Sequence, residues 1–425
     1  MAHLRWFIVS LLFLSTVINY VDRQTMSVLA PVLREQFQMS NTDYSRIVFA
    51  FLLAYMIMQS GSGWLLDRLG TRMGMALIVG WWSIAAILHA TAASVFSFGM
   101  FRFLLGMGEA GNWPGGLKAV SEWFPDKERA FAAGFFNSGS TFGAIIAAPL
   151  VTLIALRWGW QSAFLTTGAL GLLWVVLWLL SYRPPHEHPW LTEREREYIF
   201  VGQSANNENP APKVRWVDLL HYPQIWGLFL ARMSASPVWW FYVFWLPEYL
   251  KSDRNFSMTM IGYVAWIPFL TADIGCLTGG VISGWLIRHG CPVLQARKGV
   301  MSVSAVLMLS GIPAVLIDGP VEAIALISVA TFAYSNWAVN VLTLPTDIFS
   351  KEIVASVSGL SGTGAALGGM LFTLVIGRVV DRFSYVPVFV AAGIRPLVAA
   401  MFIVLMVKPI AAPVVSSPHV PQNCR

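Results

Sequence analysis

Four charged side chains lie inside otherwise apolar stretches of the N-terminal half of this sequence. Asp22 and Arg23 follow an almost wholly apolar run that starts at Leu4, and a second apolar stretch contains Arg102 and Glu109. If these stretches cross a membrane, each charge costs at least about 2.5 kcal/mol on insertion scales, so such residues usually face a bundle interior and mark a pathway. The chemistry open to them is the binding of an ion and the transfer of protons.

Helix geometry keeps Asp22 and Arg23 from pairing with each other. Adjacent residues of a helix point about 100° apart, so each of the two needs a partner of its own. We expect Arg23 to face a central cavity and to bind a substrate carboxylate with its forked N–H donors. We expect Asp22 to turn toward another helix, where Arg102 is the best-placed cation, and to serve as a second protonatable site.

The spacing of Arg102 and Glu109 puts both on one face of a helix. Seven positions separate them, which is about two turns or roughly 10 Å along the axis, so both can look into one cavity. A carboxylate with little solvation favours its protonated form, and Glu109 could therefore take up and release a proton during transport. The alternative is that Arg102 and Glu109 form a fixed structural ion pair.

The composition is that of a membrane protein. Of the 425 residues, 56% are hydrophobic and 12% are charged, whereas soluble domains carry roughly 25% charged residues. A spanning helix needs about 20 predominantly apolar residues, and helices satisfy their own backbone groups in lipid. We therefore predict an all-α membrane protein with twelve transmembrane helices, near residues 5–30, 43–66, 73–92, 96–119, 129–154, 160–181, 223–250, 259–287, 298–316, 321–344, 354–377 and 385–408.

The distribution of basic residues predicts the orientation in the membrane. With both termini cytoplasmic, most of the 28 Lys and Arg residues fall in cytoplasmic segments, as the positive-inside rule requires. The net charge of +6 then needs no nucleic acid to explain it. The three cysteines form an odd set without CxxC spacing, so neither a disulfide framework nor a zinc site is indicated.

One long polar connection divides the spans into two sets of six. It begins at Tyr182 and includes the stretch "LTEREREY", which is typical of a short surface helix. Motifs recur across it at offsets of 221 to 225: Gly63–Leu66 returns as Gly284–Ile287, and Gly139 and Gly143 return as Gly364 and Gly368. We predict two pseudo-symmetric six-helix bundles, residues 1–181 and 223–408, with a cytoplasmic linker at 182–222 and a cytoplasmic tail at 409–425.

A charged loop follows the second span, with the sequence "GSGWLLDRLGTRMG" at residues 61–74. Its glycines allow another helix to approach closely, Asp67 can face a cation or a helix N-terminus, and the arginines suit an anionic membrane surface. Positive-inside charges on a tight turn are a simpler explanation. The pattern resembles the signature loop of the major facilitator superfamily, and this resemblance implies a gate that includes Asp67, Arg68 and Arg72.

A longer stretch narrows the resemblance. Residues 101–150 contain "GLKAVSEWFPDKER" and "FNSGSTFGAIIAAPL", which resemble the anion:cation symporter family and, within it, the bacterial hexuronate transporters. The resemblance implies proton-coupled import of a sugar-acid anion, with Glu109 as a proton site and with Tyr20 and Tyr55 lining the cavity. The stretch "NYVDR" is more like the aldonate (galactonate-type) members, so Arg23 carries over from both groups and Asp22 from only one.

Further polar and aromatic side chains are candidates for the substrate cavity. They are Asn137 and Ser140 on the fifth span, Trp239 and Tyr242 on the seventh, and Asn336, Asn340 and Thr343 on one face of the tenth. An amide is costly in hydrocarbon, so we expect the polar face of the tenth span to turn toward the pore. The aromatic residues of the seventh could lie against a sugar ring, or could serve as interfacial anchors.

Three more charges within spans have structural explanations. Arg232 and Asp273 could pair between the seventh and eighth spans. Lys118 lies near an inner end of the fourth span, from which it could extend to the lipid headgroups.

The sequence contains no HExxH, GxSxG or P-loop motif and no cluster of His or Cys. We therefore predict a secondary transporter without cofactor or metal, and not an enzyme. The leading interpretation is a proton-coupled hexuronate symporter of the bacterial cytoplasmic (inner) membrane. The alternatives are an aldonate or aldarate symporter, and an organic-anion uniporter or exchanger. The expected partners are the sugar-acid anion, protons and the lipid bilayer, and we expect a monomer.

Overall fold

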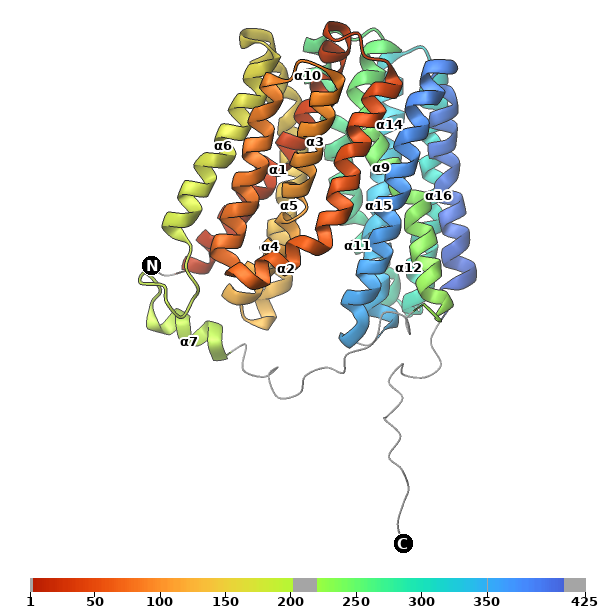
Figure 1. Ribbon diagram of the computed structural model, residues 1–425. Coiled ribbons are helices and arrows are strands. Elements are labelled where there is room, and N and C mark those ends of the chain that lie inside the picture. The colour runs from red at the N-terminus through yellow and green to blue at the C-terminus, as the bar shows by residue number, and fades with distance from the viewer. Residues whose placement is uncertain (1–2, 202–219, 350, 409–425) are drawn as a thin grey trace.

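The chain folds as a bundle of long helices that run side by side (Figure 1). The computed structural model describes residues 3–201, 220–349 and 351–408, and these ranges contain no β-strand. Nine helical stretches in the described ranges are long and apolar enough to cross a membrane. The second, fourth and seventh predicted spans, which are not among those nine, are helical as well. The prediction of an all-α membrane protein is confirmed.

The N-terminal half and the linker supply the helices drawn from red to yellow-green in Figure 1. They are α1 (Leu4–Gln36), α2 (Asn41–Leu88), η1 (His89–Thr91), α3 (Val95–Glu109), α4 (Asn112–Trp123), α5 (Asp126–Trp158), α6 (Trp160–Ser181) and the short linker helix α7 (Glu193–Val201). The second and third predicted spans are joined in α2, and the fourth is divided into α3 and α4. The "LTEREREY" stretch is helical, as expected.

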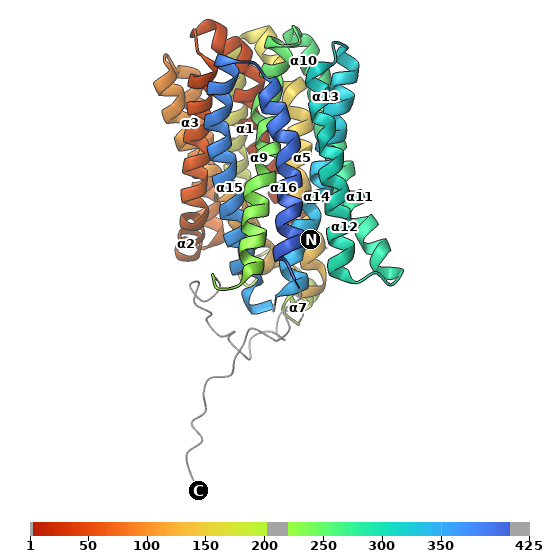
Figure 2. The ribbon, with the colours of Figure 1, turned by 90° about the vertical axis from the view of Figure 1, so that its right-hand side faces the viewer.

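The C-terminal half repeats this plan with more interruptions. Its helices are α9 (Pro223–Ser252), α10 (Met258–Val264), α11 (Ile267–Arg288), α12 (Val293–Leu307), η3 (Met308–Ser310), α13 (Gly311–Leu316), α14 (Pro320–Ile348), α15 (Lys351–Arg382) and α16 (Val386–Met406). In Figure 2, α15, α9 and α16 lie side by side across the front of this half. The proposed tail at 409–425 lies outside the described residues.

Proline and glycine explain where the spans are interrupted. Pro114 lies in the first turn of α4 and Pro268 in the first turn of α11, positions where the missing N–H of proline is tolerated. Inside α2, the backbone of Gly70 adopts φ 74°, a conformation that glycine reaches without strain. This residue lets the chain turn between the second and third spans.

The glycines of the internal repeat make equivalent contacts in the two halves. Gly139 and Gly143 of α5 lie against backbone carbonyls of α1, and Gly364 and Gly368 of α15 lie against backbone carbonyls of α9. A Cβ atom at any of the four positions would collide with that backbone. Close helix contact through small residues is a common solution in membranes, and its recurrence gives the sequence repeat a structural basis.

The two halves meet at the end of the bundle opposite α7. We call the end that carries α7 the linker face and the opposite end the far face. Near the far face, Arg34 of α1 forms an ion pair with Glu248 of α9, and the Tyr44 hydroxyl donates to the Phe244 carbonyl at 2.7 Å. Toward the linker face the helices of the two halves diverge (Figure 1).

A carboxylate of one half caps a helix of the other half at the far face. Asp381, near the end of α15, accepts the backbone N–H groups of Asn41 at 2.9 Å and Thr42 at 2.8 Å. These N–H groups belong to the first turn of α2, which has no intrahelical acceptor for them. In the part of the chain that the structure describes, the polar contacts that close the halves against each other lie on this side.

The linker helix α7 docks on the N-terminal half. Glu195 accepts the backbone N–H groups of Leu4 at 3.1 Å and Arg5 at 3.3 Å. The Arg5 guanidinium pairs with Glu195 at 2.9 Å and with Glu128 of α5 at 3.0 Å, and Tyr198 donates to Glu128 at 2.9 Å. The first part of the linker is therefore fixed to the ends of α1 and α5 at the linker face.

Candidate functional site

A buried ion pair joins α1 and α3 in the middle of the N-terminal half. The Nε atom of Arg23 lies 2.8 Å from Oε2 of Glu109, and the two side chains are 1% and 0% exposed. One turn earlier on α1, Asn19 Oδ1 accepts a second guanidinium N–H of Arg23 at 3.2 Å. The alternative of a fixed pair between Arg102 and Glu109 is not what the structure shows, because Glu109 pairs with Arg23.

Four aromatic rings surround the Arg23 guanidinium. Its central carbon lies 4.7 Å from the ring centroid of Tyr20, 5.4 Å from that of Phe51, 5.1 Å from that of Tyr55 and 5.8 Å from that of Trp240. Such cation–π contacts stabilise a positive charge away from water. Three rings come from the same half as Arg23, and Trp240 reaches it from α9 of the other half. We call these five side chains the Arg23 cluster.

Arg102 supports α1 through its backbone and makes no ion pair among the described residues. Its Nη2 donates to the Arg23 carbonyl at 2.6 Å, and its guanidinium carbon lies 5.0 Å from the Phe51 ring centroid. Its Nε and Nη1 atoms are buried without a hydrogen-bond partner. The expected hydrogen-bonded pair between Asp22 and Arg102 is therefore not formed.

Asp22 points into the N-terminal half, away from Arg23. Both carboxylate oxygens are buried without a hydrogen-bond partner, and the polar side chains nearest to them are Thr167 of α6 and Trp82 of α2. Arg102 and Glu109 lie within electrostatic reach. Helical geometry correctly separates Asp22 from its neighbour, but the side chain that it faces is a hydroxyl rather than a guanidinium.

The charged loop after the second span makes contacts at the linker face. Asp67 pairs with Lys118 of α4 at 2.5 Å, so Lys118 meets a carboxylate where we expected it to extend to headgroups. Arg72 donates to a carbonyl of α6 at 2.6 Å, and the Arg68 guanidinium lies 5.4 Å from the ring centroid of Trp64. The loop thereby connects α2 to α4 and α6.

The two predicted cavity residues of α5 are not part of the Arg23 cluster. The Ser140 hydroxyl donates to the Asn137 carbonyl of its own helix at 2.8 Å, and the Asn137 side chain is exposed. One residue further along, Thr141 lies beside Asp273 of α11. This part of α5 therefore faces the other half of the molecule.

The polar face of α14 turns into the C-terminal half, contrary to our expectation that it faces the pore. Asn336 Oδ1 accepts from Ser304 of α12 at 3.1 Å. Asn340 Oδ1 accepts from Arg297 at 3.2 Å, and its amide donates to a carbonyl of α11 at 3.3 Å. Thr343 donates to a carbonyl of its own helix at 2.9 Å. These groups satisfy one another between helices of one half.

Of the aromatic residues on α9, Trp240 rather than Tyr242 reaches the Arg23 cluster. Tyr242 is 1% exposed and packs against Phe389 of α16, inside its own half. Trp239 stacks on Tyr334 with ring centroids 5.6 Å apart. Because six of the nine positions of "VWWFYVFWL" are aromatic, the sequence offered no periodic signal that could single out Trp240.

Arg232 and Asp273 do not pair with each other. Arg232 donates to the Ser361 hydroxyl of α15 at 3.1 Å, whereas Asp273 lies beside Thr141 of the other half. The predicted ion pair between the seventh and eighth spans is wrong.

Comparison with known proteins places this geometry in a family. A model of the Major Facilitator Superfamily matches residues 12–373. The chain belongs to the Major Facilitator Superfamily. It is 37% identical to the hexuronate transporter of Escherichia coli strain K12 over 410 aligned residues. The aligned region covers 96% of this chain and 95% of that protein. It is 38% identical over 324 residues to the galacturonate transporter of Dickeya chrysanthemi, which covers 76% of this chain and 94% of that one.

A solved structure of the same superfamily agrees with the fold. The xylose transporter XylE from E. coli, in an inward open conformation, matches with a TM-score of 0.73 at 14% identity, over 96% of this chain and 97% of that one. The protein is therefore a multi-pass membrane transporter with the two-bundle major facilitator fold, and not an enzyme.

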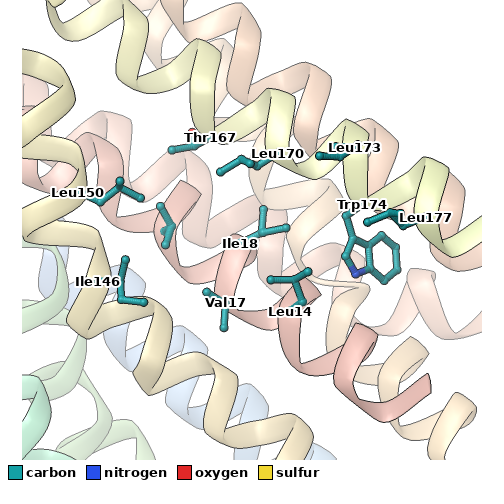
Figure 3. A pocket seen from close by; sticks show the side chains of 11 residues that line it. Leu14, Val17, Ile18, Ile146, Leu150, Thr167, Leu170, Leu173, Trp174 and Leu177 are labelled. Carbon is teal, nitrogen blue, oxygen red and sulfur yellow. The ribbon is translucent and has the colours of Figure 1, made fainter. Parts of the chain in front are cut away.

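An apolar pocket lies between α1, α5 and α6 (Figure 3). It is bounded by Leu14 and Ile18 of α1, Ile146 of α5, and Leu170 and Trp174 of α6. The lining is almost entirely hydrocarbon, which suits an acyl chain and not a sugar acid. The side chains that line this pocket include no charged group that could pair with a carboxylate.

Proposed function

We propose that the chain is a proton-coupled symporter that imports a sugar-acid anion, in the first place a hexuronate, by alternating access. The observation that carries this proposal is the buried ion pair between Arg23 and Glu109 at 2.8 Å. Similarity to a hexuronate transporter and to a galacturonate transporter supports the substrate class. The bacterial cytoplasmic membrane, with both termini cytoplasmic, is the proposed location.

In this proposal, Glu109 and the substrate carboxylate compete for Arg23, and this competition couples proton binding to anion binding. The guanidinium N–H groups that a substrate carboxylate requires are partly occupied by Glu109. A proton on Glu109 removes the charge that holds it to Arg23 and leaves the guanidinium free for the anion. Proton and anion then bind more strongly together than apart, which is the linkage that a symporter needs.

The charge balance of the site points in the same direction. Asp22 and Glu109 together offset Arg23 and Arg102 when both acids are ionised. Once the acids carry protons, the site is positive and attracts an anion. Asp22 is proposed as the second proton site because its carboxylate is buried and has no hydrogen-bond partner.

The rings of the Arg23 cluster suit the remaining part of a sugar acid. The faces of Tyr20, Tyr55 and Trp240 can lie against the apolar face of a sugar ring, and the two phenol hydroxyls can exchange hydrogen bonds with its hydroxyls. The carboxylate would then meet Arg23 from the side that Glu109 vacates.

The contacts at the two faces are proposed as gates. Transport requires the far face to open, so Arg34 must separate from Glu248, and Asp381 must leave the start of α2. At the linker face, Asp67, Arg68 and Arg72 are proposed to hold α2, α4 and α6 as one unit while the halves rock against each other.

A second candidate, an aldonate or aldarate symporter, is favoured by one observation. The acid at Asp22 in "NYVDR" resembles the aldonate members of the family rather than the hexuronate members. The shared carboxylate would still bind Arg23, so the two candidates differ in how the rest of the sugar acid is recognised.

A binding screen of the purified protein tests the proposal. Thermal shifts are measured with hexuronates, aldonates, aldarates and neutral sugars at two pH values. We expect D-glucuronate or D-galacturonate to give the largest shift, and we expect the shift to grow at the lower pH. A preference for neutral sugars would contradict the proposal that Arg23 binds a carboxylate.

A further inference from the structure

A second guanidinium within the spans has no acid to pair with in the part of the chain that the structure describes. Arg232 of α9 donates from Nη1 to the hydroxyl of Ser361 at 3.1 Å, and among the described residues no carboxylate forms an ion pair with it. Ionisable side chains at membrane depth are costly and usually mark a substrate or ion path. A single hydroxyl does not balance the charge of this group.

The surroundings place Arg232 between the halves, on the linker side of the Arg23 cluster. Tyr334 of α14 lies within electrostatic reach of Arg232 and also of Tyr20, whose ring covers Arg23. Along α9, Arg232 precedes Trp240 by eight residues, which is about 12 Å toward the linker face. Arg232 as a whole is only half-buried.

A second arginine in the same half, Arg395, has the contacts expected of a guanidinium with a structural role. Arg395 of α16 donates from Nε to the Ser234 carbonyl and from Nη2 to the Met233 carbonyl, both at 3.0 Å. Its central carbon lies 4.8 Å from the Phe372 ring centroid. Arg395 therefore fixes the backbone of α9. Arg232, by contrast, makes its hydrogen bond within the described part of the chain through Nη1 to a side-chain hydroxyl.

The space beside Arg232 is kept open by a glycine. Gly362 of α15 is the residue next to Ser361, and a Cβ atom built on it would lie 3.7 Å from Nη1 of Arg232. A larger side chain at this position would extend toward the guanidinium. The glycine thus keeps a larger side chain away from the Arg232 guanidinium.

We propose that Arg232 is a second carboxylate-binding group of the transport site, and that with Arg23 it lets the site bind six-carbon dicarboxylates of the aldarate class in addition to hexuronates. Such a diacid carries a carboxylate at each end, and arginine side chains from the two halves can reach the two ends together. Bidentate guanidinium recognition suits both ends. The inference rests on the proposed function, because it takes Arg23 as the site of the first carboxylate.

The experiment measures equilibrium binding of three probes to the purified full-length protein: D-glucarate with two carboxylates, D-glucuronate with one, and D-glucose with none. The variants are Arg232→Gln, Arg232→Lys and, as the matched control, Arg395→Gln. We expect Arg232→Gln to weaken D-glucarate binding by about tenfold or more, as for loss of a hydrogen bond to a charged group. Binding of D-glucuronate should fall much less.

The controls separate a binding role from a structural one. Arg395→Gln is expected to lower thermal stability while it keeps the ratio of the D-glucarate and D-glucuronate affinities. Arg232→Lys keeps the charge without the fork, so that ratio should fall to between the native and Arg232→Gln values. If Arg232→Gln does not fold, the lysine variant decides, and an unchanged ratio in it overturns the inference.

Two further outcomes are decisive. If the native protein binds D-glucuronate but not D-glucarate, the inference fails while the proposed function stands. If it binds only D-glucose, the proposed function fails, and this inference fails with it.

Discussion

At the scale of single residues, the exchange of partners at Arg23 decides whether proton and anion are coupled. The guanidinium is enclosed by four rings and paired with Glu109. No water reaches it to replace a lost partner, since the side chain is 1% exposed. Protonation or substitution of Glu109 therefore leaves the buried guanidinium of Arg23 without its ion-pair partner, and an anion can then pair with it.

Glu109→Gln tests this exchange through stability. Removal of one partner from a buried ion pair costs roughly 3–5 kcal/mol, so the ligand-free variant should unfold at a lower temperature than the native protein. Bound D-glucuronate should restore more stability to the variant than to the native protein. Its affinity should rise less steeply as the pH falls, because only Asp22 of the two acids still titrates. Asp22→Asn is the control, because it breaks no ion pair and should not lower the stability of the ligand-free protein.

Arg23→Lys tests the geometry of recognition rather than its charge. Lysine keeps the positive charge but lacks the forked donors, so affinity for D-glucuronate should fall by about tenfold or more. Affinity measured by isothermal calorimetry on folded, monodisperse protein checks the prediction. Native affinity in the lysine variant would show that charge alone recognises the carboxylate.

The sequence predicted that these charged residues lie inside the protein, but it did not predict which of them pair with each other. Helical angles separate Asp22 from Arg23, and the cost of a charge in lipid places Arg102 and Glu109 inside the protein. Which acid meets which base depends on how α1, α3 and α6 lie in space, and this information is not contained in the spacing along one helix. Glu109 accordingly pairs with Arg23, and Asp22 faces Thr167.

At the scale of elements, the start of α2 is where the two halves hold each other most directly. Asp381→Asn should weaken this contact, because the cap loses its negative charge beside the positive end of a helix. A change of about 0.5–2 kcal/mol, typical of helix caps, would shift the balance of conformations toward an open far face.

The measurement uses Ser45→Cys, a buried position on α2 that faces Gly377 of α15, in a background with the three native cysteines replaced. The rate of labelling by a membrane-impermeant thiol reagent should rise in Asp381→Asn. Asp43→Asn is the matched control, since Asp43 caps the same helix start through Ser40 without reaching the other half. Equal labelling in the two variants would remove Asp381 from the gate.

Trp240 is the contribution of α9 to the Arg23 cluster. Trp240→Ala should reduce anion affinity by about tenfold or more, since cation–π contacts away from water are worth about 2 kcal/mol. Trp226→Ala on the same helix is the control, because that indole is 41% exposed and donates to the Leu220 carbonyl. Binding assays compare the anion affinities of the two variants. An equal loss of affinity in both would show that Trp240 contributes only to packing.

Element boundaries were easier to predict than element faces. Apolar length located the spans, because it acts within one segment of chain. The polar face of α14 was also identified correctly as one face, through the spacing of Asn336 and Asn340. Its direction was not, because Ser304 and Arg297 on neighbouring helices supply partners that the sequence of α14 does not reveal.

At the scale of the whole molecule, the structure combines a duplicated scaffold with asymmetric chemistry. Glycine contacts recur at Gly139 and Gly364, where the two halves use the same close packing. The charges do not recur: the first half holds the ion pair, and the second half contributes Trp240 and Arg232. The repeat could be recognised in the sequence. The contacts between the halves depend on the conformation and could not be predicted from the sequence.

The closed far face and the competition at Arg23 together predict obligatory coupling of anion and proton movement. The most direct measurement is uptake of labelled D-glucuronate by proteoliposomes under an imposed inward proton gradient, with a pH-sensitive dye inside. We expect the anion to accumulate above its external concentration, the lumen to acidify beyond the liposome control, and a protonophore to abolish accumulation. Uptake that only equilibrates, leaves the internal pH unchanged and ignores the protonophore would contradict proton-coupled symport.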